Sequence, residues 1–558
     1  MSSFYDDASL VVIPSGYKTS KVYAEKPTDG SGDLTFTRTG DTATRVNSAG
    51  LIEKVRTNLV TYSEDFTNAA WNNVNQVTIT ANAGVSPNGT TTADRLLSTG
   101  SSWFFSRIIS LTSGTPYTIS VYVKSNTASS QTFRLFGNNS DFSSNLTATT
   151  SWQRFSFTIT ASIGSLAQGI ARDSSNSAVD LLVWGFQLET GDVPTAYIPT
   201  TTAAVSVGPV ANVPRLDYLG STCPRLLLEP QRTNNALYSE QLDNAAWTKQ
   251  NTTVTANVVT SPSGYQDADK LVETSATGVH RASVSSAATL NGTYSFFAKS
   301  GERTKVAILS TTIDLGFDLS NGTLIDLGSG TSGGKIENYG NGWYRCSLPQ
   351  ASGIVALALA LLDNANNVFY AGDGTSGAYF WGAQLEAATY ATSYIPTLAS
   401  ASTRSADACS KTGISSLIGQ TEGTVFVEFK RVPKGVNYQA VVTLQGASSA
   451  YLIEMYFGSA NTLLAAVYNS GQQFQSATSA LSEGTYKAAL AYKENDFAFY
   501  LNGVQISTDN SGTVPALSTF NLGDFTYSAG LPQNDGINQA LLFKTRLTNA
   551  ELAELTTL

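Results

Sequence analysis

The chain has 558 residues, more than one hydrophobic core usually accommodates, so we expect three or more domains of about 100–200 residues. A formal net charge of −9 without any basic stripe excludes a surface built to bind nucleic acid, because like charges repel. With 42% hydrophobic residues, the composition also argues against intrinsic disorder.

The first 55 residues match no other part of the chain and carry turn formers, including Pro14, Pro27 and the stretch Asp29–Gly32. Met1–Ser20 has no charged leader followed by an apolar core, so we expect no signal peptide and synthesis in a cytoplasm. The longest apolar stretch, Ile354–Leu362, is far shorter than the roughly 20 residues of a membrane span and alternates like a buried strand. We therefore expect no membrane insertion.

An internal duplication organises the middle of the chain. A phrase containing RTN, YSE and NAAW occurs at Arg56–Trp71 and again at Arg232–Trp247. Each copy closes with a tryptophan block and then a YIPT block, namely Trp184–Glu189 with Tyr197–Thr200, and Trp381–Glu386 with Tyr394–Thr397. These limits define repeat 1 (56–202), a connector (203–231) and repeat 2 (232–398). Repeat 2 is longer, and we place its extra residues in a loop within the Gly/Ser/Asn-rich stretch Asn321–Gly342.

Alternating side chains predict strands within the repeats. Tyr117, Ile119, Val121 and Val123 would point into a core, and the residues between them, such as Tyr122, would face water. Turn residues recur about every 8–12 positions, which is typical of packed antiparallel sheets. We therefore predict an all-β protein with tandem, jelly-roll-like antiparallel β-sandwiches.

A low-charge linker (399–419) leads to a third domain (420–558) that does not match the repeats. Thr424–Lys430 reads as a strand, and Tyr486–Tyr492 pairs with Asp496–Leu501 before a tight turn at Asn502–Gly503. Only Leu547–Leu555 has helical spacing with an N-cap, so we expect one short terminal helix.

The third domain resembles a known family of sandwiches. The segments EGTVFVEF, FYLNGV and LLFKTRLTNAELAEL are similar to the laminin-G-like, concanavalin-A-like sandwich of many adhesion proteins. The resemblance covers roughly the last 140 residues and implies a C-terminal sandwich of that type.

A second resemblance involves the segments before each repeat. ATRVN with GLIE, and NVPRLDY with CPRLLLEPQRTN, resemble a module of tailed-phage head-spike fibres and tail fibres. In that family GLIE is expected to lead directly into NVPRLDY, whereas here repeat 1 stands between them, so the chain looks like a member with an added copy.

This resemblance implies a virion surface protein with carbohydrate-binding-like sandwiches that attach to a host cell-surface glycan. The N-terminal segment (1–55) would dock on other virion proteins of the capsid or tail. A homo-oligomer, as a trimer, is expected by analogy with fibres.

Catalytic motifs are missing from the sequence. It contains one histidine, His280, and no HExxH, nucleophile elbow or phosphate-binding glycine loop. Cys223, Cys346 and Cys409 have neither disulfide nor zinc spacing. We expect no enzyme and no cofactor, although two carboxylates at a suitable separation would be enough for a polysaccharide depolymerase.

Aromatic side chains on exposed faces are the candidates for glycan binding, because sugar rings stack their C–H faces on them. We nominate Trp103 and Tyr122 in repeat 1, and Tyr294 and Phe297 in repeat 2. The tryptophans that recur in both copies are equally explained by core packing; these are Trp71, Trp184, Trp247 and Trp381. Calcium is the one metal we consider, at Asp524, Asn534 and Asp535 in loops of the third domain.

Three functions remain open at this point. The first is a virion fibre or spike whose weak glycan-binding modules gain strength from many copies. The second is a purely structural capsid or tail decoration protein. The third is a polysaccharide depolymerase.

Overall fold

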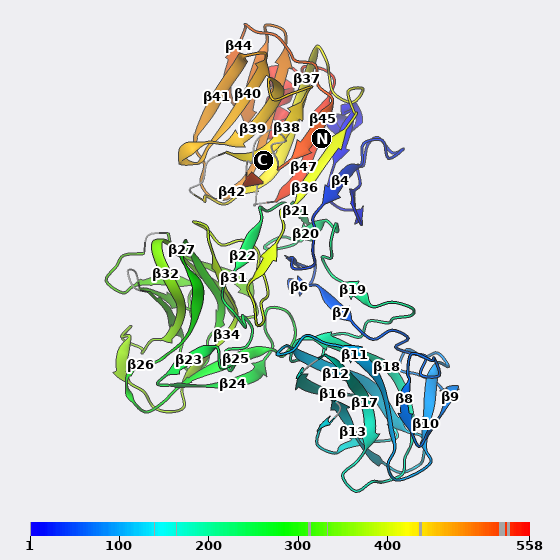
Figure 1. Cartoon of the computed structure of the whole chain (residues 1–558). Coiled ribbons are helices and arrows are strands. Elements are labelled where there is room, and N and C mark those ends of the chain that lie inside the picture. Colours follow the sequence, from blue (N-terminus) through cyan, green and yellow to red (C-terminus); the bar gives the residue numbers. More distant parts are fainter. Residues whose placement is uncertain are drawn as a thin grey trace.

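The computed structural model describes residues 2–138, 140–162, 164–310, 314–331, 333–434, 438–523, 531–532 and 536–557. Strands dominate these residues, which confirms the all-β prediction with tandem antiparallel sandwiches (Figure 1). The helical elements described are α1 (Ser2–Asp7), a short 3₁₀ turn (Ser459–Asn461) and α2 (Asn549–Thr556). Helix α2 is the predicted terminal helix, and Thr548 caps it in a capping box with Glu551.

Repeat 1 packs two antiparallel sheets around a core that includes Trp71, Trp103 and Phe186. The first sheet has the order β16 (Gln153–Thr160), β12 (Pro116–Ser125), β18 (Asp180–Thr190), β10 (Ala93–Ser98) and β9 (Val77–Gly84). The second has the order β14 (Asp141–Phe142), β13 (Gln131–Gly137), β17 (Ser165–Arg172), β11 (Phe104–Ser110) and β8 (Asn73–Asn75), with β15 (Leu146–Ala148) on β13.

Repeat 2 has the same plan, but long strands join its two layers. β27 (Arg281–Lys299) takes the places of β11 and β12, and β32 (Trp343–Leu361) takes those of β16 and β17. The sheet continues through β24 (Thr252–Val259), β25 (Ala268–Glu273), β34 (Gly377–Glu386), β28 (Lys305–Leu309), β29 (Leu315–Asp318) and β30 (Thr323–Asp326), with β23 (Trp247–Gln250) and β31 (Lys335–Gly340) alongside. β26 (Thr277–Val279) and β33 (Phe369–Ala371) pair separately.

The extra residues of repeat 2 differ from the prediction. We expected a loop over Asn321–Gly342, but part of this stretch forms β30 and β31, and β31 pairs with β32. Lys335, Glu337 and Tyr339 alternate along β31 and so share one side of it. The Gly/Ser-rich composition masked these two short strands.

The same bulge occurs in both repeats. The pairing of β12 with β18 shifts register between Ser120 and Tyr122, and that of β27 with β34 shifts between Ser295 and Phe297. The bulges bring Gly185 and Gly382 to φ of 65° and 64°, a conformation that favours glycine. This explains why each tryptophan block reads Trp-Gly.

An aspartate with the same role recurs in both copies. Asp94 accepts backbone N–H groups of Phe66 (2.9 Å) and Asn82 (2.8 Å), so it ties one loop and the irregular part of β9 to β10. Asp269 does the same in repeat 2 with Leu242 (2.7 Å) and with Asn257 of β24 (2.9 Å). The repeated ADRL and ADKL phrases therefore fix a loop and the neighbouring strand.

The alternation prediction for β12 holds on one side only. Ile119, Val121 and Val123 are buried as expected. Thr118 and Ser120, expected to face water, are also buried, because the segment after β18 covers them: Thr118 donates to the carbonyl of Gly191 (2.9 Å).

The C-terminal sandwich recruits strands from the whole chain. One sheet has the order β20 (Arg215–Asp217), β21 (Arg225–Leu227), β47 (Ile537–Phe543), β37 (Glu422–Arg431), β42 (Gly484–Lys493), β43 (Phe497–Leu501) and β44 (Val504–Asp509), with β1 (Leu10–Val12) on β47. The other has the order β2 (Tyr17–Lys18), β3 (Lys21–Val22), β4 (Leu34–Thr37), β36 (Ala408–Thr412), β45 (Thr519–Leu522), β38 (Gln439–Gln445), β39 (Tyr451–Phe457), β40 (Thr462–Asn469) and β41 (Gln472–Ala480), with β46 (Leu531–Pro532) on β38.

The N-terminal segment is consequently part of this sandwich and not a separate unit. Leu10–Val12 pairs with β47, and Thr35–Thr37 pairs with β36, which lies in the expected linker (Figure 1). Sequence alone did not reveal this, because neither partner strand is near in the chain. A docking role for residues 1–55 stays a prediction.

A buried ion network joins the segments that flank the repeats. Arg38 pairs with Asp407 (3.2 Å), and Arg215 pairs with both Asp407 and Glu229, the latter at 2.6 Å. Arg404 also pairs with Glu229, at 2.9 Å, and all five side chains are buried. Burial alone would raise the pKa of Glu229, but Arg404 and Arg215 hold that pKa well below its usual range.

Candidate functional site

Repeat 1 carries an aromatic face where β12 and β18 meet. The ring of Tyr122 lies 5.5 Å from that of Trp184 and 6.3 Å from that of Tyr197, and the Trp184 and Tyr197 rings are 4.8 Å apart. The bulge at Gly185 brings Tyr122 and Tyr197 together. Both rings lie beside the position that a side chain at Gly185 would occupy. Tyr122 and Tyr197 are half-buried, so part of each side chain remains accessible.

Charged groups surround this aromatic face. The guanidinium of Arg154 lies 5.5 Å from the centre of the Tyr122 ring, and Lys124 lies 5.5 Å from that of Trp152. Glu64 accepts a hydrogen bond from the Tyr197 hydroxyl at 3.1 Å. The face therefore combines apolar rings with donors and an acceptor, which is the mixture that polyhydroxylated ligands need.

Repeat 2 contains the same constellation. The Phe297 ring lies 5.4 Å from Trp381 and 6.2 Å from Tyr394, and those two are 4.7 Å apart. Arg345 stands over Phe297 at 5.5 Å, as Arg154 stands over Tyr122. The duplication thus copied the aromatic face together with its cation.

The two copies differ in what covers them. In repeat 2, the hairpin of β5 (Thr44–Val46) and β6 (Ile52–Lys54) packs Val46 and Ile52 onto the rings. Phe297 is 1% exposed and Tyr394 2%, whereas Tyr122 and Tyr197 in repeat 1 are half-buried. Trp152 is likewise half-buried, and its counterpart Trp343 is buried. The tyrosine rings of this face are therefore more exposed in repeat 1 than their counterparts in repeat 2.

The nominated aromatic residues divide accordingly. Trp103 is 0% exposed, and its indole donates to the carbonyl of Ser177 at 2.9 Å, so the expectation that it is exposed is wrong. The same correction applies to Tyr294 and Phe297, which are core residues of repeat 2. Tyr122 alone lies on an open face. Alternation identifies the side of a strand that a residue occupies, but it does not tell which side another segment covers.

Sequence reasoning missed Trp152, Arg154 and Tyr197 as site residues, although Tyr197 begins one of the two recurring YIPT blocks. The available signal was the recurrence of Trp and Arg two positions apart, at Trp152 and Arg154 and again at Trp343 and Arg345. Recurrence marked the constellation but gave no information on the hairpin that covers one copy.

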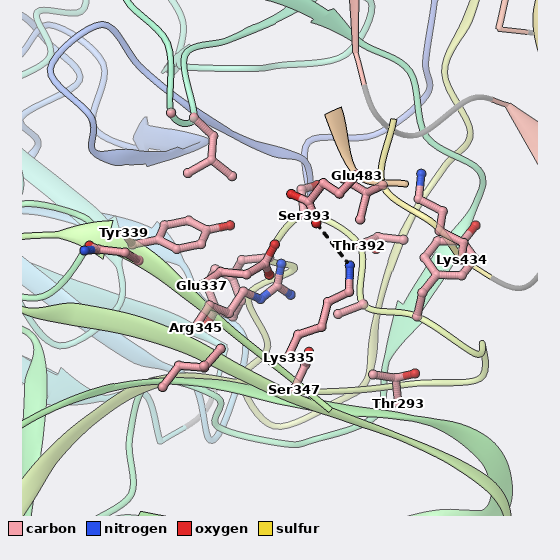
Figure 2. A pocket seen from close by; sticks show the side chains of 18 of the residues that line it. Thr293, Lys335, Glu337, Tyr339, Arg345, Ser347, Thr392, Ser393, Lys434 and Glu483 are labelled. Carbon is pink, nitrogen blue, oxygen red and sulfur yellow. Dashed lines mark ion pairs between the residues drawn. The ribbon is translucent and has the colours of Figure 1, made fainter. Parts of the chain in front are cut away.

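A large cavity lies at the junction of repeat 2, the β5–β6 hairpin, the β20–β21 hairpin and the rest of the C-terminal sandwich. Its volume is about 1140 Å³. Lys335, Glu337 and Tyr339 of β31 line it together with Arg345 and Ser347 of β32 (Figure 2). The opposite walls come from β5, from the connector around Asp217–Arg225, and from residues 430–434 and 483 of the C-terminal sandwich.

An ion pair crosses this cavity: Lys335 of repeat 2 lies 3.8 Å from Glu483 of the C-terminal sandwich (Figure 2). Lys430, also of the C-terminal sandwich, lies 3.4 Å from the same carboxylate. Burial raises the pKa of the Tyr339 hydroxyl, so this group is a neutral donor near pH 7.

The remaining candidates have structural roles or fall outside the description. His280 is buried, with Nδ1 2.8 Å from the carbonyl of Asn251. Asp524, Asn534 and Asp535 lie outside the described residues. Among the residues that are described, no group of three His, Cys, Asp or Glu side chains is placed to hold a metal ion. The three cysteines are free thiols, two of them buried. No described helix is long and apolar enough to cross a membrane.

No family model and no curated protein matches the chain. Parts of it are similar to solved structures. The CBM40 module of the Ruminococcus gnavus IT-sialidase matches with 14% identity and a TM-score of 0.23, over 26% of this chain and 91% of that one. Domain 4 of a GH43 arabinanase from Geobacillus stearothermophilus, in complex with arabinotriose, matches with 11% identity and a TM-score of 0.23, over 30% and 82%. A pentraxin from Limulus polyphemus matches with 17% identity and a TM-score of 0.19, over 24% and 68%. None of these likenesses assigns a role to a residue of this chain.

Proposed function

We propose that the protein is a glycan-binding surface component of a tailed-phage virion, a fibre or spike that attaches to the host through repeat 1. The observation that carries the glycan-binding part is the open aromatic face of Tyr122, Trp152 and Tyr197, with Arg154 and Lys124 beside it. A sugar would stack its C–H groups on the face of an exposed ring and exchange hydroxyl hydrogen bonds with the charged groups.

The virion assignment rests on the segments around the two hairpins that resemble fibre modules. In this proposal the protein has no catalytic role, and attachment depends on many weak sites displayed together. A trimer of the chain would present three repeat 1 faces on one particle.

The test of glycan binding uses the full chain and immobilised bacterial surface polysaccharides, with polymer length measured in parallel. Tyr122→Ala and Trp152→Ala should each weaken binding about tenfold, the scale of one lost aromatic contact. The matched control is Phe369→Ala, which removes an aromatic ring that is 67% exposed elsewhere, on repeat 2. Equal binding by all three variants would contradict the proposed site.

Shortening of the polymer would instead make the protein a depolymerase. Absence of binding to every polysaccharide would favour a purely structural decoration protein. Separately, an antibody to the chain should label intact phage particles, and light scattering should give the mass of a trimer.

A further inference from the structure

The junction cavity depends on residues that repeat 2 has and repeat 1 lacks. The extra stretch of repeat 2 forms β31, whose Lys335, Glu337 and Tyr339 share one side, and that side faces the cavity (Figure 2). In repeat 1, the edge of β16 corresponding to β32 has no such strand beside it among the described residues. The insertion therefore supplies a wall with three functional side chains.

The charge of the cavity is opposite to that of the protein. The chain carries a formal net charge of −9, yet six basic side chains and only four carboxylates line the cavity. One of those carboxylates, Glu229, already belongs to the buried ion network, and one of the basic groups, Arg45, pairs at 2.8 Å with Glu53, which is not in the lining. A single carboxylate, Glu483, lies 3.8 Å from Lys335 and 3.4 Å from Lys430. The cavity is thus a local site of positive charge that favours anions.

The rest of the lining suits a hydroxyl-rich ligand. The polar side chains of Thr323, Asn338 and Thr389 are exposed and line the cavity beside the charges. Tyr339 contributes a half-buried ring, and the ring of Tyr390, which is buried, lies on the far side. The volume of about 1140 Å³ slightly exceeds the roughly 300–1,000 Å³ of typical small-molecule sites, which leaves room for several sugar units.

We propose that this cavity is a second ligand site, specific for an anionic saccharide with carboxylate groups, such as a short uronic acid polymer. Lys335 binds a carboxylate of the ligand, Tyr339 stacks on a sugar ring, and the exposed polar side chains of the lining bind hydroxyl groups. Glu483 occupies the anion position in the absence of ligand and is displaced by the ligand carboxylate. This site is separate from the repeat 1 face and requires residues of repeat 2 and of the C-terminal sandwich together.

The displacement of Glu483 gives a test in which two variants act in opposite directions. The full chain is titrated with the trimer of galacturonic acid and, as the neutral counterpart, with the galactose trimer of the same linkage. Lys335→Gln should weaken binding of the acidic trimer about tenfold, because a charge-assisted hydrogen bond is lost. Glu483→Gln should strengthen it, because a competing carboxylate is removed. Higher salt should weaken it in the unmodified protein.

Lys305→Gln is the matched control, since it makes the same change of charge in repeat 2 outside the cavity, where Lys305 binds the carbonyl of Asn364 (2.9 Å). This control should leave the affinity unchanged. Equal affinity for both trimers, no binding of the acidic trimer, or weakening by Glu483→Gln would each overturn the proposal. Tyr122→Ala should not affect the acidic trimer, so failure here and failure of the repeat 1 site are distinguishable.

Discussion

The buried ion network predicts a large effect of a single conservative substitution. Glu229 accepts hydrogen bonds from Arg215 (2.6 Å), Arg404 (2.9 Å) and the backbone N–H of Ser393 (2.8 Å). Glu229→Gln keeps the shape but leaves three buried guanidinium groups with one carboxylate, Asp407. Removing one partner of a buried pair costs about 3–5 kcal/mol. If the C-terminal sandwich and the segments joined to it unfold together, the melting temperature of this unit should fall by roughly 10 °C.

The hairpin before repeat 1 provides the matched control. Glu53 occupies the position that Glu229 has before repeat 2, three residues before RTN in each case. It pairs with Arg45 at 2.8 Å, but these side chains are 12% and 21% exposed, so Glu53→Gln should cost less than about 1 kcal/mol. Both variants would be compared by urea unfolding and by differential scanning calorimetry. Equal losses in the two variants, or no loss in Glu229→Gln, would refute the reasoning.

The carboxylate of Glu229 also predicts how the stability of the protein depends on pH. Its pKa in the folded protein lies below the ordinary value of 4.5, so its stabilising contribution is complete above that value. The contribution should disappear as the pH falls below about 4. Glu229→Gln should show a smaller loss of stability over this acidic range than the unmodified protein does.

Three further outcomes are expected. Burial raises the pKa of Asp269 to about 7 from its ordinary 3.8, so its effect on stability becomes unfavourable as pH rises across that window, and Asp269→Asn should flatten the pH profile of urea unfolding there. Gly382→Ala should destabilise more than Gly185→Ala, because an added Cβ would lie 2.8 Å from the Phe297 ring, against 3.2 Å to the nearest ring atom in repeat 1; each also carries a left-handed φ that costs about 1–2 kcal/mol. Trp103→Ala should lower the unfolding free energy of repeat 1 by about 3–5 kcal/mol in denaturant titrations, a loss of fold and not of a surface contact.

The sequence was sufficient for the elements and their class. Alternation located β37, β42 and β43 to within a few residues, and the Asn502–Gly503 turn has positive φ at both residues, as a two-residue hairpin requires. Helix α2 followed from its N-cap. These features depend on interactions between near neighbours in the chain.

The long-range pairings could not be predicted in this way. β1 joins a strand more than 500 residues later, and β4 joins the expected linker, because both ends of the chain complete one sandwich. This limit affected the prediction of the site residues most. Tyr122 and Phe297 occupy the same place in a duplicated sequence, yet one is accessible and the other is buried under a hairpin from a different part of the chain.

The different exposure of the aromatic face in the two repeats has a structural explanation. Two hairpins flank the repeats: β5–β6 covers the aromatic face of repeat 2, and β20–β21 is a part of the C-terminal sheet. The two hairpins also contact each other, since Asp217 accepts the backbone N–H of Val46 at 2.8 Å. Both are therefore engaged in joining repeat 2 to the C-terminal sandwich, and among the described residues neither hairpin packs on the rings of repeat 1. Repeat 1, which stands between the two hairpins in the chain, has the aromatic face without this cover, so that face is more exposed there, while repeat 2 is joined to the C-terminal sandwich.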